Sequence, residues 1–360
     1  MSIVKFYGVD SYLDKTVDKE IINFLKKCNR VVHSKAILLK PNLLSASIPE
    51  KGITTNPVLL QKIIFALRKV SNAKLYLGDS PGANFMNYKE VLRITGVGEI
   101  CEKNSVEIVR IEKFAPIMND GVIYSSIVND FDTIINIPKL KTHSFTGLTL
   151  GVKNLFGLIP GTHKISYHRK YPDPLDFAFA IYKFYEIISD KVVNILDGII
   201  AHHGEGPARG KPVKLGILGM SDDAVGMDIE LTKLLKLRPF FCKTNQAALM
   251  KGYDTKNINL ETYNITDIPA IKLPMSTKID FIPKFIKKWI AGKVYVKPEV
   301  NDIKCIKCML CLKSCPVGAI YKDNNYIKID KKKCIECFCC YEVCESEAID
   351  LKKSLLYKVI

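Results

Sequence analysis

The sequence predicts an α/β protein, with a mostly parallel sheet flanked by helices and a small α+β domain at its C-terminal end. Two observations lead to this prediction. Short apolar segments alternate with helical segments up to about residue 275, and nine of the twelve cysteines lie between Cys305 and Cys344. We therefore expect a large domain over residues 1–275, a linker over residues 276–298 and a small cysteine-rich domain over residues 299–360.

The large domain is expected to alternate strands and helices. Apolar strand candidates cover residues 36–39, 75–77, 133–137, 192–196 and 215–218, and helix candidates cover residues 57–70, 88–93, 175–188 and 227–235. Thr55-Asn56-Pro57 and Asp173-Pro174 mark two helix starts, because a polar cap followed by proline suits the first helical turn. Such alternation favours a largely parallel sheet with helices on its faces.

Polar side chains follow four of these strands. Lys40 and Asn42 follow the first, Asp79 the second and Asp197 the strand at 192–196, while Pro138-Lys139-Leu140-Lys141-Thr142-His143 follows the strand at 133–137. The carboxyl ends of parallel strands are the edge at which open α/β sheets bind ligands. We therefore expect one cationic cleft. If the strand continues, Lys139 and Lys141 face the same way, and this pairing of like charges favours a bound anion.

The candidate site residues fall into two groups by the role that we assign to them. Protonation, anion stabilisation and the orientation of these groups are assigned to His143, Lys141, Lys153, Asp79 and Asp197. Substrate binding is assigned to Lys40, Asn42, Lys139, Thr142, Asn154, His163 and His202. Other roles stay open: Asp79 could cap a helix, Asp197 could hold a turn, and His143 could ligate a metal or hydrogen-bond within a loop.

The linker has an amphipathic pattern. Phe281, Phe285 and Trp289 recur at intervals of four residues, and lysines occupy mostly other positions. This spacing predicts a short basic helix within residues 276–298. Its apolar stripe could pack between two domains or bind a membrane surface or an acidic partner.

The C-terminal cysteines form an internal duplication. The run C-I-K-C-M-L-C-L-K-S-C starts at Cys305, and the run C-I-E-C-F-C-C-Y-E-V-C starts at Cys334, an offset of 29 residues. Each run has the C-x-x-C-x-x-C-x-x-x-C spacing of bacterial two-cluster ferredoxins, which it resembles. A zinc ribbon needs four ligands and leaves the third and fourth cysteines of each run unexplained. A domain this small buries too little apolar surface to fold well without its metals.

The ferredoxin resemblance implies two [4Fe-4S] clusters, each bound by three cysteines of one run and the last cysteine of the other. The implied ligand sets are Cys305, Cys308, Cys311 and Cys344 for one cluster, and Cys334, Cys337, Cys340 and Cys315 for the second. Glu345 stands where the family has a second proline. Cys339 is an extra thiol, either a buried bystander or a substitute ligand.

The large domain resembles a second family. The motifs that carry this resemblance are Lys40-Pro41-Asn42, Gly78-Asp79-Ser80, the 138–143 segment, Gly151-Val152-Lys153-Asn154-Leu155-Phe156-Gly157, Asp197-Gly198, Gly204-Glu205-Gly206-Pro207 and Ser221-Asp222-Asp223-Ala224-Val225. In this order they are similar to the domain-of-unknown-function family 362, which is often fused to a two-cluster ferredoxin. The resemblance covers roughly residues 35 to 240 and implies an architecture more than a particular reaction.

The composition and the absence of certain motifs argue against several classes of function. The absence of a Walker loop and of a strand-adjacent G-x-G-x-x-G argues against nucleotide hydrolysis and NAD-driven hydride transfer. The formal charge of +16 suits an anionic small molecule or an acidic redox partner, but no basic stripe with interleaved aromatic residues indicates nucleic acid. Since neither a signal peptide nor an apolar run long enough for a transmembrane segment is evident, we expect a cytoplasmic protein, from a host living with little oxygen.

These observations predict a ferredoxin-coupled oxidoreductase. Single electrons from the clusters would reach an anionic organic substrate or cofactor at the strand-end loops, with a ferredoxin or another redox protein as electron donor or acceptor. A flavin or a further metal in the cleft is left open. The alternative is a non-catalytic electron-transfer protein whose large domain docks a partner.

Overall fold

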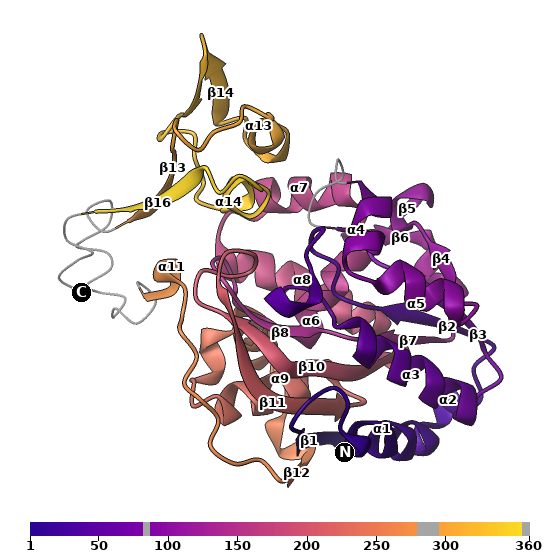
Figure 1. Ribbon diagram of the computed structural model, residues 1–360. Coiled ribbons are helices and arrows are strands. Elements are labelled where there is room, and N and C mark those ends of the chain that lie inside the picture. The colour runs from indigo at the N-terminus through magenta and orange to yellow at the C-terminus, as the bar shows by residue number, and fades with distance from the viewer. Residues whose placement is uncertain (82–86, 279–294, 355–360) are drawn as a thin grey trace.

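A computed structural model describes residues 1–81, 87–278 and 295–354 (Figure 1). A ten-stranded mixed sheet forms the centre of the described N-terminal part, in the order β12-β1-β11-β10-β7-β2-β3-β4, with β8 paired to β10 and β9 paired to β8. The strands are β1 (Ser2–Gly8), β2 (Ala36–Lys40), β3 (Lys74–Gly78), β4 (Glu107–Val109), β7 (Thr133–Asn136), β8 (Lys139–His143), β9 (Gly147–Thr149), β10 (Val192–His203), β11 (Lys211–Ser221) and β12 (Ile258–Tyr263). A separate hairpin joins β5 (Pro116–Asn119) to β6 (Val122–Ser125).

Helices cover both faces of this sheet. They are α1 (Lys15–Lys27), α2 (Asn29–Val32), α3 (Pro57–Val70), α4 (Tyr88–Ile94), α5 (Val97–Lys103), α6 (Gly151–Asn154), α7 (Gly161–Lys170), α8 (Pro174–Ile188), α9 (Ala224–Leu234) and α10 (Lys243–Met250). Strand β2 shows how two cores arise from one strand. Ile37 and Leu39 pack into the core formed with α1, α3 and α5, whereas Leu38 points to the opposite core, formed with α8 and α10.

The predicted fold class is confirmed: the sheet is mostly parallel, and helices flank it. The expected strands correspond to β2, β3, β7, β10 and β11, and the expected helices to α3, α4, α8 and α9. The last of these helices begins at Ala224, three residues before the expected start, because the Asp223 side chain caps it by accepting from the Val225 amide. Strand β11 is antiparallel to both of its neighbours.

The placement of Asp197 at a strand end was wrong. Strand β10 continues to His203, so Asp197 lies in its middle, paired with Leu218 of β11 and Lys139 of β8. The 138–143 segment is likewise no loop, since Lys139–His143 form the buried strand β8, which extends the line of β7 along β10. Apolar character alone marked β10 only up to Leu196, because Asp197 interrupts the apolar run; its carboxylate is buried by Tyr12 and Lys139 from elsewhere in the chain.

The C-terminal part is small and built around the duplicated cysteine runs. Strand β13 (Val296–Val300) pairs with β16 (Ile349–Lys353), and β14 (Ile320–Asp323) pairs with β15 (Tyr326–Ile329). Helix α13 (Leu310–Ser314) belongs to the first run and α14 (Cys339–Glu342) to the second. The backbone repeats as the sequence does, with positive φ at Lys307 and Met309 and again 29 residues later at Glu336 and Phe338.

The predicted linker helix lies mostly outside the described residues. Helix α11 (Met275–Lys278) is the last described element before residues 279–294, which contain Phe281, Phe285 and Trp289. The domain limits and the linker helix stay predictions. Among the described residues, no helix is both long and apolar enough to cross a membrane.

Candidate functional site

A cavity of about 110 Å³ lies where the C-terminal part meets the large sheet. Its walls come from the residues that end β2 and β3, from β8, α6 and α7, and on the opposite side from α14 of the C-terminal part. Figure 1 shows α14 beside α7 above the edge of the sheet. The cavity is therefore lined by residues of the predicted polar edge of the sheet and by residues of the predicted cluster domain.

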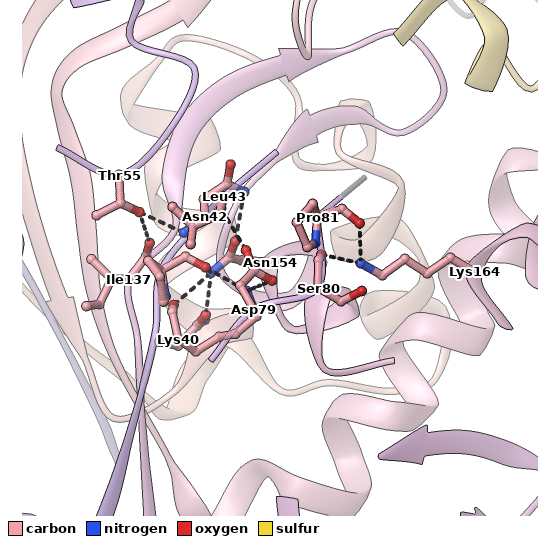
Figure 2. Close-up of polar contacts among 12 residues, drawn as sticks. Lys40, Asn42, Leu43, Thr55, Asp79, Ser80, Pro81, Ile137, Asn154 and Lys164 are labelled. Atoms are coloured by element: carbon pink, nitrogen blue, oxygen red, sulfur yellow. Dashed lines mark hydrogen bonds and ion pairs between the residues drawn. The ribbon is translucent and has the colours of Figure 1, made fainter. Parts of the chain in front are cut away.

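On one side of the cavity, Lys40 and Asp79 form an ion pair against the backbone of Gly157. Lys40 Nζ lies 2.8 Å from Asp79 Oδ1, with the two side chains 0% and 5% exposed, and the Leu43 amide donates to Asp79 Oδ2 at 2.7 Å (Figure 2). A Cβ atom at Gly157 would lie 2.0 Å from Asp79 Oδ1 and 2.6 Å from Lys40 Nζ. Gly157 is thus required for the close approach of backbone to the ion pair. In the part of the chain that the structure describes, Asp79 caps no helix; its carboxylate is held by Lys40 and the Leu43 amide.

A line of amide side chains orients Lys141. Lys141 Nζ donates to Asn42 Oδ1 at 2.8 Å and to the carbonyl of Ile53 at 2.9 Å. Asn42 in turn donates to Asn154, and Asn154 donates to Asn136, each at 2.8 Å. Since every acceptor of Lys141 is neutral, burial lowers its pKa to about 7.

Lys153 faces the cavity beside aromatic rings. Its Nζ lies 4.6 Å from the centroid of the Phe156 ring and 5.5 Å from that of Phe177. Such rings attract a cation, but more weakly than a carboxylate does. Burial accordingly lowers the pKa of Lys153 to about 8. An ammonium group held in this way can still accept an anionic partner.

Lys164 reaches the same cavity from α7. Its Nζ donates to the carbonyls of Ser80 and Pro81, the second at 3.2 Å (Figure 2). Burial lowers its pKa to about 7. The sequence analysis missed this residue, because an isolated lysine in a helix with other basic residues has no pattern that separates it from a surface lysine.

The ring of His143 has a defined orientation. Its Nδ1 accepts from the Phe145 amide at 3.1 Å, so in the neutral ring the proton is assigned to Nε2. Nε2 lies 3.7 Å from Glu342 Oε1 of α14. Burial lowers the pKa of His143 well below 6.5 and raises the pKa of Glu342 to about 7. A neutral imidazole that lines the cavity with its N–H is suited to donate a hydrogen bond to an anionic or carbonyl oxygen.

The predicted site residues divide into two sets. Those that line the cavity are Lys40, Asn42, Asp79, Lys141, His143, Lys153 and Asn154. Those outside its lining are Lys139, Thr142, His163, Asp197 and His202. Ser80, Thr149, His168, Cys339 and Glu342 also line it. Glu342 lies in the other domain, so nothing in its local sequence could indicate this position.

Lys139 and Asp197 pair with each other beneath the cavity. Lys139 Nζ lies 2.9 Å from Asp197 Oδ2, both side chains are fully buried, and the Tyr12 hydroxyl donates to Asp197 Oδ1 at 2.8 Å. The anion expected for Lys139 is thus met by a side chain of the protein itself. His202 bonds through Nδ1 to the Lys51 carbonyl and through Nε2 to the Gly210 amide, at 2.9 and 2.8 Å.

The loop of residues 204–210 holds the C-terminal part against the large sheet. Arg209 donates through Nη1 to the carbonyl of Ile349 and through Nη2 to that of Cys344, the latter at 3.1 Å. Its guanidinium also stacks 4.0 Å from the centroid of the Tyr341 ring. A Cβ atom at Gly206 would lie 2.0 Å from the Thr142 carbonyl, so glycine lets this loop pack directly on β8.

The cysteines fit the cluster sets that the ferredoxin resemblance implies. A small cavity is lined by Cys315, Cys334, Cys337 and Cys340 together with apolar side chains. The thiol of Cys311 interacts electrostatically with those of Cys344, Cys308 and Cys305, while burial raises its pKa to about 11. The Ala319 and Ala348 amides donate to Cys315 Sγ and Cys344 Sγ at 3.1 and 3.2 Å, as suits thiolate ligands. Among the described residues no three His, Cys, Asp or Glu side chains are grouped for a single metal ion.

Comparisons with known proteins place both parts of the chain. Residues 37–233 match the family described as "Domain of unknown function (DUF362)", and residues 297–345 match the family "4Fe-4S dicluster domain". The chain is similar to the "Thylakoid-associated protein sll1697" of Synechocystis, with 32% identity over 222 residues that cover 60% of this chain and 66% of that relative, just under two thirds of its length. It is also similar to "Ketoisovalerate oxidoreductase subunit VorD" of Pyrococcus furiosus, with 54% identity over 35 residues, 9% of this chain and 33% of that subunit.

These matches support 4Fe-4S cofactors and an iron–sulfur electron-transfer role. The predicted combination of the two domain types is confirmed. The chain therefore belongs to the DUF362 family and joins that domain to a C-terminal 4Fe-4S dicluster domain.

Proposed function

We propose that this protein is an oxidoreductase that passes single electrons from two [4Fe-4S] clusters to an anionic organic substrate or cofactor held in the cavity. One observation carries the proposal. Helix α14 contains Cys340, a cysteine of the second run, and the same helix supplies Cys339 and Glu342 to the cavity wall. A ligand in the cavity would therefore lie next to a cluster, which suits transfer of electrons between them.

The cluster ligands are proposed as the resemblance implies. Cys305, Cys308, Cys311 and Cys344 would hold one cluster, and Cys334, Cys337, Cys340 and Cys315 the other. When bound, the clusters supply one-electron chemistry. Cys339 lines the substrate cavity and not the small cavity among the cysteines, which favours a role outside the ligand set.

The residues that line the cavity would bind the substrate and move protons. Lys141 and Lys153 stabilise negative charge and can supply protons, and His143 donates a hydrogen bond from Nε2 to the substrate. Asp79 fixes Lys40, and Asn42 and Asn154 orient Lys141. We assign Lys139 and Asp197 to the support of β8 and β10 beneath the site, since their charges already neutralise each other.

The proposed reaction needs protons and a redox partner in addition to the clusters and the substrate. Reduction of one double bond of a substrate takes up two electrons, one from each cluster, and two protons. A ferredoxin or another redox protein would then restore the electrons. For the reverse direction the same partner would accept them. A cytoplasmic location stays part of the proposal.

The test is anaerobic. The purified protein is reduced, and anionic organic compounds are screened for reoxidation of the clusters at a catalytic rate. Lys141→Met and His143→Gln should lower turnover at least tenfold while the cluster absorbance is retained. The first removes an ammonium group from the cavity, and the second removes the imidazole ring. Lys74→Met is the matched control. Lys74 lies exposed at the start of β3, so its substitution should leave turnover unchanged.

A non-catalytic electron carrier is the second candidate. The similarity to VorD over 35 residues supports it, since that protein is a subunit of an oxidoreductase. Under this alternative no small molecule reoxidises the reduced protein, whereas a redox protein does. That outcome would overturn the enzyme proposal.

A further inference from the structure

The cavity contains more positive than negative charge. Lys40 is matched by Asp79 at 2.8 Å. The other lysines of the lining are Lys141, Lys153 and Lys164, and the remaining carboxylate is Glu342. When Lys141, Lys153 and Lys164 are protonated and Glu342 is ionised, three ammonium groups share one carboxylate, which leaves two positive charges for a ligand to balance. A buried excess of this size is costly unless an anion offsets it.

Two buried hydroxyl groups of the lining lack hydrogen-bond partners among the described residues. They are Ser80 Oγ and Thr149 Oγ1, and their residues are 3% and 4% exposed. A buried hydroxyl without a hydrogen-bond partner destabilises the fold, so each is a candidate donor to a ligand oxygen.

Each hydroxyl accompanies a different lysine. Lys164 Nζ donates to the Ser80 carbonyl, which places Ser80 at the α7 side. Thr149 is the direct cross-strand partner of Lys141 in the β8–β9 ladder, and such residues share a face of the sheet. Figure 2 shows Lys164 approaching Ser80 from one side, while Asn42, the acceptor for Lys141, lies on the other side of Ser80.

We propose that the cavity binds a small organic dianion of the dicarboxylate class, with one anionic group at Lys164 and Ser80 and the second at Lys141 and Thr149. The inference rests on the proposed function, because it names the substrate class of the same cavity. The charge of Lys153 acts on both Lys141 and Lys164, so this ammonium group supports either end of the ligand. Under this proposal a compact anion such as inorganic phosphate engages only one of the two lysine–hydroxyl pairs.

The pKa values agree with a ligand of this kind. Burial lowers the pKa of Lys141 and of Lys164 to about 7, although each amine has hydrogen-bond acceptors. A carboxylate beside each amine would favour the charged form and raise both pKa values.

The experiment measures binding without electron transfer. Succinate, butyrate and inorganic phosphate are titrated into the oxidised, cluster-containing full-length protein by anaerobic calorimetry near pH 6.5. We expect succinate to bind at least about tenfold more tightly than either other anion, since only succinate places a carboxylate at both lysine–hydroxyl pairs. Lys153→Met and Thr149→Val should each remove much of this preference, and the exposed Lys74→Met should keep it.

Two outcomes would overturn the inference. Equal affinity for succinate and butyrate would show that the second charge is not recognised, and tighter binding of phosphate would show one compact site. Binding and turnover also separate the two proposals. If succinate binds but no dicarboxylate reoxidises the reduced clusters, the ligand class stands and the catalytic proposal fails. If a monoanion is turned over and dicarboxylates do not bind, only the ligand class fails.

Discussion

Arg209 contacts the C-terminal part through two hydrogen bonds and one aromatic ring, and its removal should loosen the association of the two parts. In Arg209→Ala the two hydrogen bonds to the carbonyls of Cys344 and Ile349 and the stacking on Tyr341 are lost together. A hydrogen bond from a charged group contributes about 1.5–3 kcal/mol, and a cation over a ring about 0.5–2 kcal/mol. Because the guanidinium is only partly buried, we expect a loss of about 3 kcal/mol, which corresponds to about a 100-fold rise in the undocked population.

The assay is hydrogen–deuterium exchange of the full-length, cluster-containing protein. Amides of residues 204–210 and of α14 should exchange faster by up to about 100-fold, because exchange follows the population of the open state. The visible absorbance of the clusters should not change, since Arg209 binds carbonyls and no thiol. Arg209→Lys keeps the charge but not the planar fork, so an intermediate effect is expected.

Arg93→Ala is the matched control. Arg93 is an exposed arginine of α4 that pairs with Glu90, at 3.8 Å. Its loss should leave exchange at the interface unchanged. The reasoning fails if Arg209→Ala exchanges no faster than Arg93→Ala in residues 204–210 and α14. Reduced turnover together with normal interface exchange would instead give Arg209 a role within the reaction.

Three further predictions concern the ion pair, the cysteines and pH. Gly157→Ala should lower the free energy of unfolding by about 1–3 kcal/mol or more in urea titrations, since its Cβ would meet Asp79 at 2.0 Å; Gly98→Ala, with its nearest atom at 3.3 Å, is the control and should differ little. Cys315→Ser should lower the iron and sulfide content of the purified protein, whereas Cys339→Ser should not, and equal losses in both would contradict the proposed ligand sets. Dicarboxylate binding should weaken between about pH 6 and pH 9, because the lysine amines with pKa values of about 7 and 8 lose their charge as the pH rises. Calorimetry in buffers of different ionisation heats should then show proton uptake on binding near pH 8, and pH-independent affinity would refute this account.

The lysine titrations also affect stability in a defined direction. The folded-state pKa of Lys141 and of Lys164 is about 7, and the unfolded value is 10.5. Between these values the unfolded chain binds more protons than the folded one. The contribution of these two residues therefore stabilises the fold as the pH rises from about 7 to about 10, and anion binding should reduce this dependence.

Sequence patterns predicted the parts of the protein that depend on interactions between residues close together in the chain. The spacing of the cysteines follows from the short chain segments that bind a cluster, and the caps at Asn56 and Asp173 act within their own helical turns. Apolar segments of three to five residues located β2, β3 and β7. The part of β10 after Leu196 escaped detection because its polar residues are buried by partners far away in the sequence, as Asp197 is by Tyr12 and Lys139.

The amino-acid sequence by itself determined an α/β domain with a polar strand-end edge and a duplicated cysteine domain after it. The tertiary structure alone decided which charges are already neutralised. Lys139 and Lys141 are two residues apart on β8, yet Lys139 meets the carboxylate of Asp197 and Lys141 meets neutral oxygens of Asn42 and Ile53. It also brought Glu342 of the cluster domain to His143 across nearly 200 residues of chain. A side chain's partners are set by contacts between distant segments, and these contacts separate a charge that supports the fold from one that can bind a ligand.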